Sequence, residues 1–285
     1  MLQASIIYDC LMTLLPRSGN GTPMVAVITG AASGMGEAFA RRLAKDGAMV
    51  AVLDLNGEQA TRVADEIGGT AFNVDVVDSD AFDAAVDAVV AKYGHLDIFI
   101  NNAGIAPPAS EADLDITISN QMKRFADDIA GLEPVNQLTR LSNQDWDRMI
   151  KVHLYGTFYG CRAALRHMIP ARAGSIVNIS SVLGQRHSAA APHYAAAKAG
   201  IISLTKSVSE EASGLGVRVN AVCPGWIDTP LLAPFSDRLK TMITSRIGVG
   251  RMGTPEELAE LVRFLCGPES SYCTGDIFTA SGGYN

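Results

Sequence analysis

The chain has 285 residues, a formal net charge of -7 and a hydrophobic content of 48%. This length and composition are typical of one large α/β domain with its own core. The negative charge offers no basic footprint for nucleic acid. No segment reaches the ~20 uninterrupted apolar residues that a bilayer span needs. We therefore expect a soluble protein that binds neither nucleic acid nor a membrane.

The cysteines and the first residues bear on the cell compartment. The five cysteines are scattered and form no C-x-x-C pair, which argues against a disulfide framework and against a metal site. Residues 1–23 contain the apolar run CLMTLLP, but they lack a basic leading region and a small-residue cleavage site. We expect an N-terminal extension rather than a signal peptide, no metal, and a cytoplasmic protein.

Short β-branched runs alternate with helical patterns from residue 24 onward. The runs MVAVIT, AMVAVLD, TAFNV and LDIFI are separated by helical patterns at 34–46, 57–67 and 79–93. In the last of these, apolar residues recur at i, i+3, i+4, i+7 and i+8, as in a helix that lies on a sheet. This alternation predicts right-handed βαβ units around a parallel sheet.

The same alternation resumes in the second half of the chain. A helix is predicted over about 143–169, then the strand SIVNIS, a helix over about 193–213 and the strand VRVNAV. Near the end, Thr254 is expected to cap a helix that has Pro255 at its first position and Glu257 completing a capping box.

Residues 105–142 do not follow this alternation. Ile118, Met122, Phe125 and Ile129 recur there at near-helical spacing, which predicts a short amphipathic helix. Two interpretations stay open. The insertion is either a lid or subunit contact, or a surface excursion that packs one apolar face.

The stretch TGAASGMG joins the first strand to the first helix. Gly30, Gly34 and Gly36 permit a tight turn, at which the amides of a helix N-terminus can bind a pyrophosphate. Asp54 ends the second strand, where a carboxylate can accept hydrogen bonds from the adenosine ribose. A 2′-phosphate there would meet like charge, and no Lys or Arg occupies the three positions after Gly30. These features favour NAD over NADP, although each alone also fits an ordinary turn.

Further motifs follow the glycine turn in a fixed order. They are NVD at 73–75, NNAG at 101–104, SIVNISS at 175–181, Tyr194-x-x-x-Lys198 and PGWIDTP at 224–230. Together they resemble the short-chain dehydrogenase/reductase family, in general character its 3-oxoacyl reductase-like and hydroxysteroid-type members. The resemblance implies a single Rossmann-like domain, here 24–285, with a doubly wound, seven-stranded parallel sheet flanked by helices, assembled as a homotetramer or a dimer.

The resemblance gives Tyr194 and Lys198 a chemical role. Residues four apart share a helix face, and a tyrosine can act as the acid for ketone reduction and as the base for alcohol oxidation. Lys198 is expected to lower the tyrosine pKa from about 10 and to bind the ribose hydroxyls. Ser181 matches the family serine that orients the substrate carbonyl. Neighbouring Ser180 is expected to act structurally.

One position departs from the family pattern. Where the family commonly has an asparagine that holds a water chain leading from the active-site lysine, this chain has His153. Imidazole can donate and accept hydrogen bonds, so we hypothesise that His153 preserves or modifies the proton relay. The alternative is a buried histidine that serves packing alone. His187 and His193 resemble variable positions and receive no catalytic role.

The remaining cofactor positions also come from the resemblance. Thr229 is expected near the nicotinamide carboxamide, and Asn101 resembles a residue of the adenine and ribose passage. The full cofactor-binding set comprises Gly30, Ser33, Gly34, Met35, Gly36, Asp54, Asp75, Val76, Asn102, Ala103, Gly104, Tyr194, Lys198, Pro224, Gly225, Ile227 and Thr229.

We therefore predict an NAD(H)-dependent oxidoreductase that interconverts a secondary alcohol and a ketone by hydride transfer. Specificity is expected from 105–142, 184–192 and an apolar cover at 226–252, with 3-oxoacyl-type or steroid-like carbonyls as candidates. The alternative is a catalytically silent dinucleotide-sensing or interaction protein on the same fold. The intact Ser181, Tyr194 and Lys198 argue against it.

Overall fold

A computed structural model describes residues 21–107, 111–233 and 235–284. The expected extension at 1–23 therefore lies almost entirely outside the described residues. Among the described residues, no helix is both long enough and apolar enough to cross a membrane.

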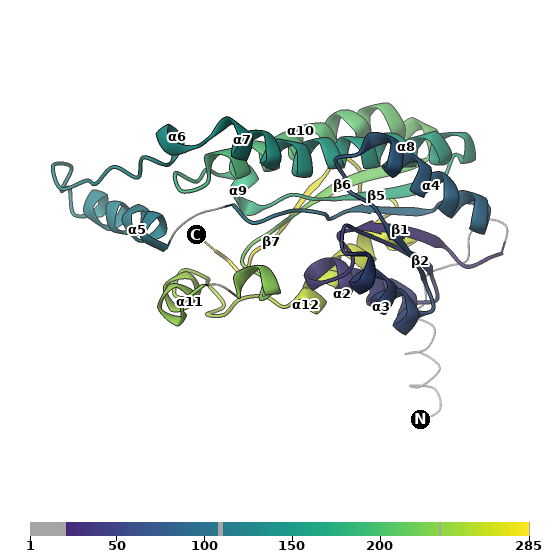
Figure 1. Ribbon diagram of the computed structural model, residues 1–285, viewed down its shortest axis with the longest axis horizontal. Coiled ribbons are helices and arrows are strands. Elements are labelled where there is room, and N and C mark those ends of the chain that lie inside the picture. Colours follow the sequence, from purple (N-terminus) through teal and green to yellow (C-terminus); the bar gives the residue numbers. More distant parts are fainter. Residues whose placement is uncertain (1–20, 108–110, 234, 285) are drawn as a thin grey trace, which may run out of the picture.

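Seven parallel strands form one central sheet (Figure 1). Their order is β3-β2-β1-β4-β5-β6-β7, which confirms the doubly wound arrangement. The strands are β1 (Val25–Thr29), β2 (Met49–Asp54), β3 (Thr70–Asn73), β4 (Ile98–Asn101), β5 (Gly174–Ile179), β6 (Val217–Pro224) and β7 (Ile277–Ala280). The order reverses between β1 and β4, so a crevice opens at the carboxyl ends of these two strands.

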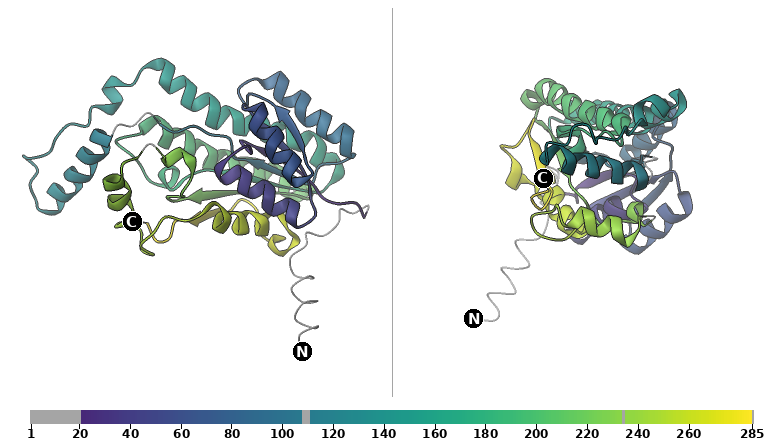
Figure 2. Two further views of the ribbon diagram at one scale, coloured as in Figure 1. Left: turned by 60° about the horizontal axis from the view of Figure 1, so that its bottom comes forward. Right: turned by 90° about the vertical axis from the view of Figure 1, so that its left-hand side faces the viewer.

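Helices cover both faces of the sheet, as the end-on view in Figure 2 shows. One face carries α2 (Gly34–Lys45), α3 (Gly57–Ile67) and α12 (Pro255–Cys266). The other carries α4 (Ser79–Tyr93), α8 (Gly156–Ala171) and α10 (Pro192–Ala212). The remaining described helices are α5 (Glu111–Phe125), α6 (Gln137–Arg140), α7 (Asn143–Ile150), α9 (Val182–Gln185), α11 (Asp237–Thr244), a π-helical turn (Lys151–Tyr155) and the 3-10 turns Ser213–Leu215, Pro230–Leu232 and Pro268–Ser270.

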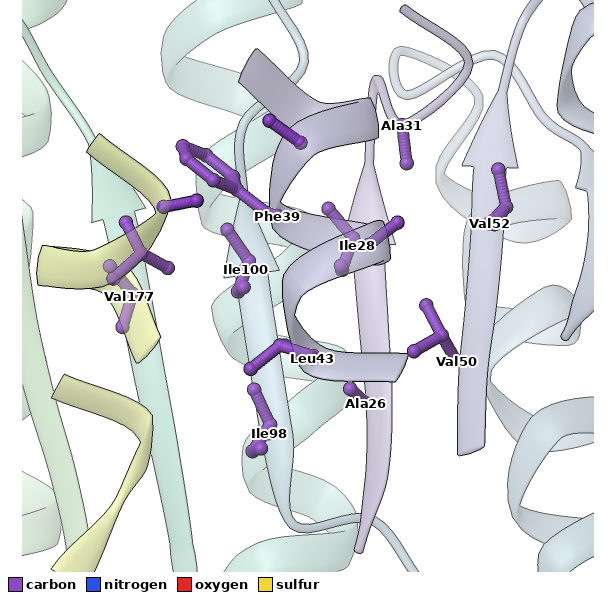
Figure 3. Close-up of a cluster of buried hydrophobic side chains, with 14 of the residues drawn as sticks. Ala26, Ile28, Ala31, Phe39, Leu43, Val50, Val52, Ile98, Ile100 and Val177 are labelled. Atoms are coloured by element: carbon purple, nitrogen blue, oxygen red, sulfur yellow. The ribbon is translucent and has the colours of Figure 1, made fainter. Parts of the chain in front are cut away.

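The alternation of side chains along β1 divides the core into two halves. Ala26 and Ile28 pack against Phe39 and Leu43 of α2 on one face (Figure 3). Val25 and Val27 belong to the cluster on the opposite face. Because successive strand residues point to opposite sides, an uninterrupted apolar strand can support both helix layers.

The end of the chain confirms the predicted capping box. Thr254 Oγ1 accepts the Glu257 amide hydrogen at 3.2 Å, and Glu257 Oε2 accepts the Thr254 amide hydrogen at 2.9 Å. Arg251 also donates to Glu257, so the side chain of Glu257 ties the start of α12 to the residues that precede the helix.

The helix predicted over about 143–169 differs in one respect. Between α7 and α8 the chain forms the π-helical turn Lys151–Tyr155, with His153 at its centre. Such a turn widens the helix and is often found at functional sites. Here it places the histidine ring beside the NNAG loop.

The insertion extends away from the body as α5 and α6 (Figure 1). Of the four apolar residues, Ile118 is half-buried and lines the cavity described below, whereas Met122, Phe125 and Ile129 are 65%, 82% and 60% exposed. Both interpretations of the insertion therefore stay open. The buried residues of α5 are polar. Asp113 pairs with Arg140, and the side chain of Asn120 forms two hydrogen bonds with the backbone of residue 133.

Candidate active site

A cavity of about 1650 Å³ opens at the carboxyl ends of the central strands. Its wall contains the whole predicted catalytic group, Ser181, Tyr194, Lys198 and His153. It also contains the expected cofactor-binding residues except Gly36. The motifs that are distant in sequence thus surround one space.

The glycine turn forms one end of this cavity. Gly30 has φ +63°, a conformation that side-chain-bearing residues rarely adopt. At Gly36, an added Cβ would lie 2.1 Å from the Gly30 carbonyl oxygen. Asn102 Nδ2 donates to the carbonyls of Thr29 and Gly30, at 3.1 and 3.0 Å. These bonds hold the turn against the NNAG loop, while the close contact at Gly36 holds it against α2, whose first amides can receive a pyrophosphate.

Asp54 lies beside this turn at the end of β2. Its Oδ2 accepts the Ala32 amide hydrogen at 3.0 Å, and its Oδ1 accepts that of Asn56 at 2.9 Å. The adjoining hollow is lined by Asp54, Leu55, Asn56, Gly57, Thr61 and Asn73, without a basic side chain among these described residues. The residues present fit the adenosine ribose of a dinucleotide.

Two neighbouring serines have different partners. Ser181 caps α9, and its Oγ accepts the Leu183 amide hydrogen at 3.1 Å. Ser180 Oγ instead donates to the Lys198 carbonyl at 2.8 Å. The serine hydroxyl of position 180 therefore anchors α10 to the end of β5, in line with the structural role expected for it.

Tyr194 stands in the first turn of α10, and Lys198 lies one turn further on the same side. The Lys198 ammonium is 5.6 Å from the centroid of the Tyr194 ring and donates to the Ile179 carbonyl at 2.8 Å. The lysine is buried, with 4% exposure. The expected proximity of the two side chains is therefore present.

Burial dominates the electrostatics of this pair. It raises the pKa of Tyr194 to about 12, against a smaller lowering by a hydrogen bond with Ser181. It also lowers the pKa of Lys198 to about 7, opposed by the nearby thiol of Cys223. The expectation that Lys198 makes the phenol more acidic is thus not met by the protein alone, because desolvation disfavours both charged forms.

His153 is buried between the NNAG loop and Tyr194. Its Nε2 lies 3.2 Å from the Ile105 amide nitrogen and 3.1 Å from the Ile105 carbonyl oxygen. Its ring meets the Tyr194 ring edge-on, with centroids 5.2 Å apart. Burial, followed by the charge of Lys198, holds the pKa of His153 well below its usual value, so the imidazole is neutral. Among the described residues, Nδ1 has no hydrogen-bond partner.

Two findings depart from the sequence analysis. Asn101 does not border the cavity. Its buried Nδ2 donates to Asn178 Oδ1 at 2.8 Å and ties β4 to β5. Conversely, Arg186, Arg246 and Tyr284 border the cavity, although no role was expected for them. The sequence does offer a signal for the two arginines, because Arg186 lies in 184–192 and Arg246 in 226–252, two of the segments expected to set specificity.

No metal centre is found among the residues that the structure describes, since they include no group of three His, Cys, Asp or Glu side chains that could hold an ion. Next to Tyr194, the groups that the cavity can offer to a reaction are hydroxyls, an amine and an imidazole.

Comparisons with known proteins agree with this geometry. The family described as short chain dehydrogenase matches residues 24–125, and the one described as enoyl-(acyl carrier protein) reductase matches 127–285. A 3-oxoacyl-(acyl-carrier-protein) reductase of Thermotoga maritima is 38% identical over 264 residues, which cover 91% of this chain and 96% of the relative. A cis-4-hydroxycyclohexanecarboxylate dehydrogenase of Sinomonas cyclohexanicum has the same identity and coverage.

A solved structure shares the fold over nearly the full length. It is a Brucella melitensis chain titled ribose-5-phosphate isomerase, with a TM-score of 0.78, 34% identity and 92% of each chain covered. The family matches, the relatives and the seven-stranded sheet all lead to the same assignment. This chain belongs to the short-chain dehydrogenase/reductase family.

Proposed function

We propose that this protein is an NAD(H)-dependent dehydrogenase that interconverts a secondary alcohol and a ketone, with Tyr194 as its acid and base. Family membership makes it an oxidoreductase that acts on a CH–OH group or the corresponding carbonyl. The observation that supports the finer proposal is the single cavity, which runs from the glycine turn to Ser181, Tyr194 and Lys198.

Asp54 supports NAD rather than NADP as the cofactor. A bound NAD would supply the hydride acceptor for oxidation, and NADH the donor for reduction. Asp54 is placed to accept from ribose hydroxyls, and the hollow next to it holds no described basic residue that could neutralise a 2′-phosphate. Like charge would therefore oppose NADP at this position.

Tyr194 is suited to donate a proton at neutral pH. With its pKa raised to about 12, the phenol is protonated and can donate to a developing alkoxide during ketone reduction. Ser181 shares the wall and can hydrogen-bond the same oxygen, which stabilises negative charge in the transition state. In oxidation the tyrosine must lose its proton, and the ammonium form of Lys198 favours that loss.

His153 is proposed to take part in proton transfer behind Tyr194. Its neutral ring contacts the tyrosine, while Nδ1 has no described partner and can donate to or accept from water. This arrangement would take over the role that an asparagine fills elsewhere in the family.

The substrate end of the cavity is walled by apolar side chains. Trp226, Phe235, Leu239 and Ile243 line it from the segment expected to form a cover, and Leu114 lines it from α5. Relatives act on a hydroxycyclohexanecarboxylate and on 3-oxoacyl groups, both of which place the reacting carbon in an aliphatic frame. We propose a substrate with an aliphatic ring or chain of this kind.

A variant pair tests the proposal. With 4-oxocyclohexanecarboxylate and a 3-oxoacyl thioester as substrates, we expect kcat/KM at least tenfold higher with NADH than with NADPH. Tyr194→Phe should lower kcat about 100-fold or more, because the proton donor is lost, while the Kd for NAD stays within about twofold. Tyr272→Phe is the control, since Tyr272 is fully exposed.

Full activity of Tyr194→Phe would refute the acid and base assignment, and a preference for NADPH would refute the role of Asp54. Binding of NAD without turnover on a broad panel of ketones and alcohols would instead support a silent sensor.

A further inference from the structure

Two arginines converge on one aromatic ring at the substrate end of the cavity. Arg186 follows α9 and Arg246 follows α11, and their guanidinium carbons lie 5.9 and 5.7 Å from the centroid of the Tyr284 ring. Tyr284 in turn meets Trp226 edge-on, with centroids 6.2 Å apart. All four side chains line the cavity.

Each guanidinium group donates to a neutral oxygen. Arg186 donates to the Tyr284 carbonyl at 3.0 Å, and Arg246 donates to the Gln121 side chain at 2.7 Å. Among the described residues, Arg186 forms no ion pair. A guanidinium carries five N–H donors in a planar fork, so one neutral bond leaves most of the capacity of Arg186 for a ligand.

The charge of the cavity differs from that of the chain. The chain has a formal net charge of -7. In the described lining, Asp54 and Asp75 lie at the dinucleotide end, and Asp147 is the remaining carboxylate. The lysines and arginines of the lining are Arg124, Arg148, Lys151, Arg186, Lys198 and Arg246. A positive cavity in an acidic protein attracts anions and raises their local concentration.

We propose that Arg186 and Arg246 form a subsite for a carboxylate on the substrate, so that the protein acts on hydroxy acids and oxo acids. This inference rests on the proposed function and specifies its substrate class. The planar fork of an arginine matches the two oxygens of a carboxylate, and such charged hydrogen bonds are about twice as strong as neutral ones. The adjoining Trp226 and Tyr284 rings supply the apolar wall for the carbon frame.

The subsite also joins the two segments that cover the cavity. Through Gln121, Arg246 connects the end of α11 to α5. Arg238 and Asp115 form a second link between these helices at 2.7 Å, and the Ser236 amide donates to Glu111 at 2.6 Å. An acid bound at Arg246 would therefore lie at the junction of the insertion and the substrate-cover segment.

The experiment compares two substrates of nearly equal shape. 4-Oxocyclohexanecarboxylate and 4-oxocyclohexanecarboxamide share the carbonyl and the ring but differ in charge. We expect kcat/KM to be at least about tenfold higher for the acid. Arg186→Gln should reduce this preference at least about tenfold, because kcat/KM for the acid loses a charged hydrogen bond and falls much further than kcat/KM for the amide.

Three further variants sharpen the result. Arg246→Gln should act in the same direction, and Arg186→Lys should keep part of the preference because it retains the charge without the fork. Lys206→Gln removes an equal charge from an exposed position of α10 outside the cavity, and it should leave the preference unchanged.

A failure of the carboxylate subsite can be distinguished from a failure of the proposed dehydrogenase activity. If neither ketone is reduced, calorimetry on the NAD-saturated protein compares cyclohexanecarboxylate with cyclohexanecarboxamide, and selective, Arg186-dependent binding of the acid would still support the subsite. Equal handling of acid and amide, or the same preference in Arg186→Gln, would overturn it. Inorganic phosphate that competes more strongly than the carboxylate would overturn the carboxylate assignment in favour of phosphate esters.

Discussion

Lys198 lines the cavity although its burial has an energetic cost. Burial lowers its pKa to about 7 from the ordinary 10.5, so between these values the unfolded chain binds one more proton than the folded chain. The penalty for this group is present in full below pH 7 and is relieved as pH rises toward 10.5. The lysine stays in place because its amine bonds to the Ile179 carbonyl and faces Tyr194.

A Lys198→Met variant tests this linkage. The free energy of unfolding of the wild type minus that of the variant should increase between pH 7.5 and 9.5 by roughly 1 kcal/mol per pH unit, since a one-unit pKa difference corresponds to about 1.4 kcal/mol. Chemical denaturation at several pH values measures it. For Lys206→Met, at an exposed position, the free energy of unfolding should change with pH as it does in the wild type. The same pH dependence in Lys198→Met would show that Lys198 is not desolvated.

The pH–rate profile of His153→Asn decides whether His153 relays protons or serves packing alone. If the neutral ring relays protons behind Tyr194, His153→Asn should lower kcat about tenfold and shift the apparent pKa of the pH–rate profile by about half a unit or more. The Kd for NAD should not change. Packing alone predicts a loss of thermal stability with an unaltered profile, because the ring would then take no part in proton transfer.

At the scale of elements, the glycine turn depends on backbone contact. In Gly36→Ala, the new Cβ would lie 2.1 Å from the Gly30 carbonyl oxygen and 2.6 Å from Asn102 Nδ2, so the turn and α2 must separate. We expect about 1–3 kcal/mol of lost stability and at least tenfold weaker NAD binding. Thermal unfolding and calorimetry measure both effects.

Gly214→Ala provides the matched control for this prediction. A Cβ at Gly214 meets no atom within 4 Å, so its stability should stay within about 0.5 kcal/mol of the wild type. Equal tolerance at positions 36 and 214 would contradict the contact between the turn and α2.

The helices show where local sequence signals fail. The capping box at Thr254 and Glu257 follows from side chains three residues apart, and it forms as predicted. The π-helical turn at Lys151–Tyr155 has no such local signal, since a helix-forming sequence looks alike whether or not one turn is widened. The turn depends on contacts with the NNAG loop and α10, which are remote in sequence.

For the whole molecule, the exposed aromatic residues bear on assembly. Tyr155, the last residue of the π-helical turn, is 46% exposed, Phe158 in the first turn of α8 is 44% exposed, and Phe125 of α5 is 82% exposed. Apolar surface of this kind marks interaction sites when it is contiguous. We propose a homotetramer, so light scattering should give the mass of four chains, and Phe158→Glu should reduce it.

Phe125→Glu distinguishes a subunit contact from a lid, the two functional roles considered for the insertion. A fall in mass with this variant would assign α5 to a subunit contact. An unchanged mass with altered KM would assign it to the cover of the cavity, to which Leu114 and Gln121 already contribute. A monomeric wild type would contradict the assembly.

The sequence by itself determined the parallel α/β sheet, the glycine turn, Asp54 and the order of the motifs around Ser181, Tyr194 and Lys198. These features depend on residue type and short spacing, which a linear pattern retains. Only the tertiary structure decided the acidity of Tyr194 and Lys198, the burial of Asp113 and Asn120 in α5 and the meeting of Arg186, Arg246 and Tyr284. Desolvation and long-range contacts depend on which residues surround a group in the folded protein. Most of those residues are distant in sequence, so a local sequence pattern does not reveal them.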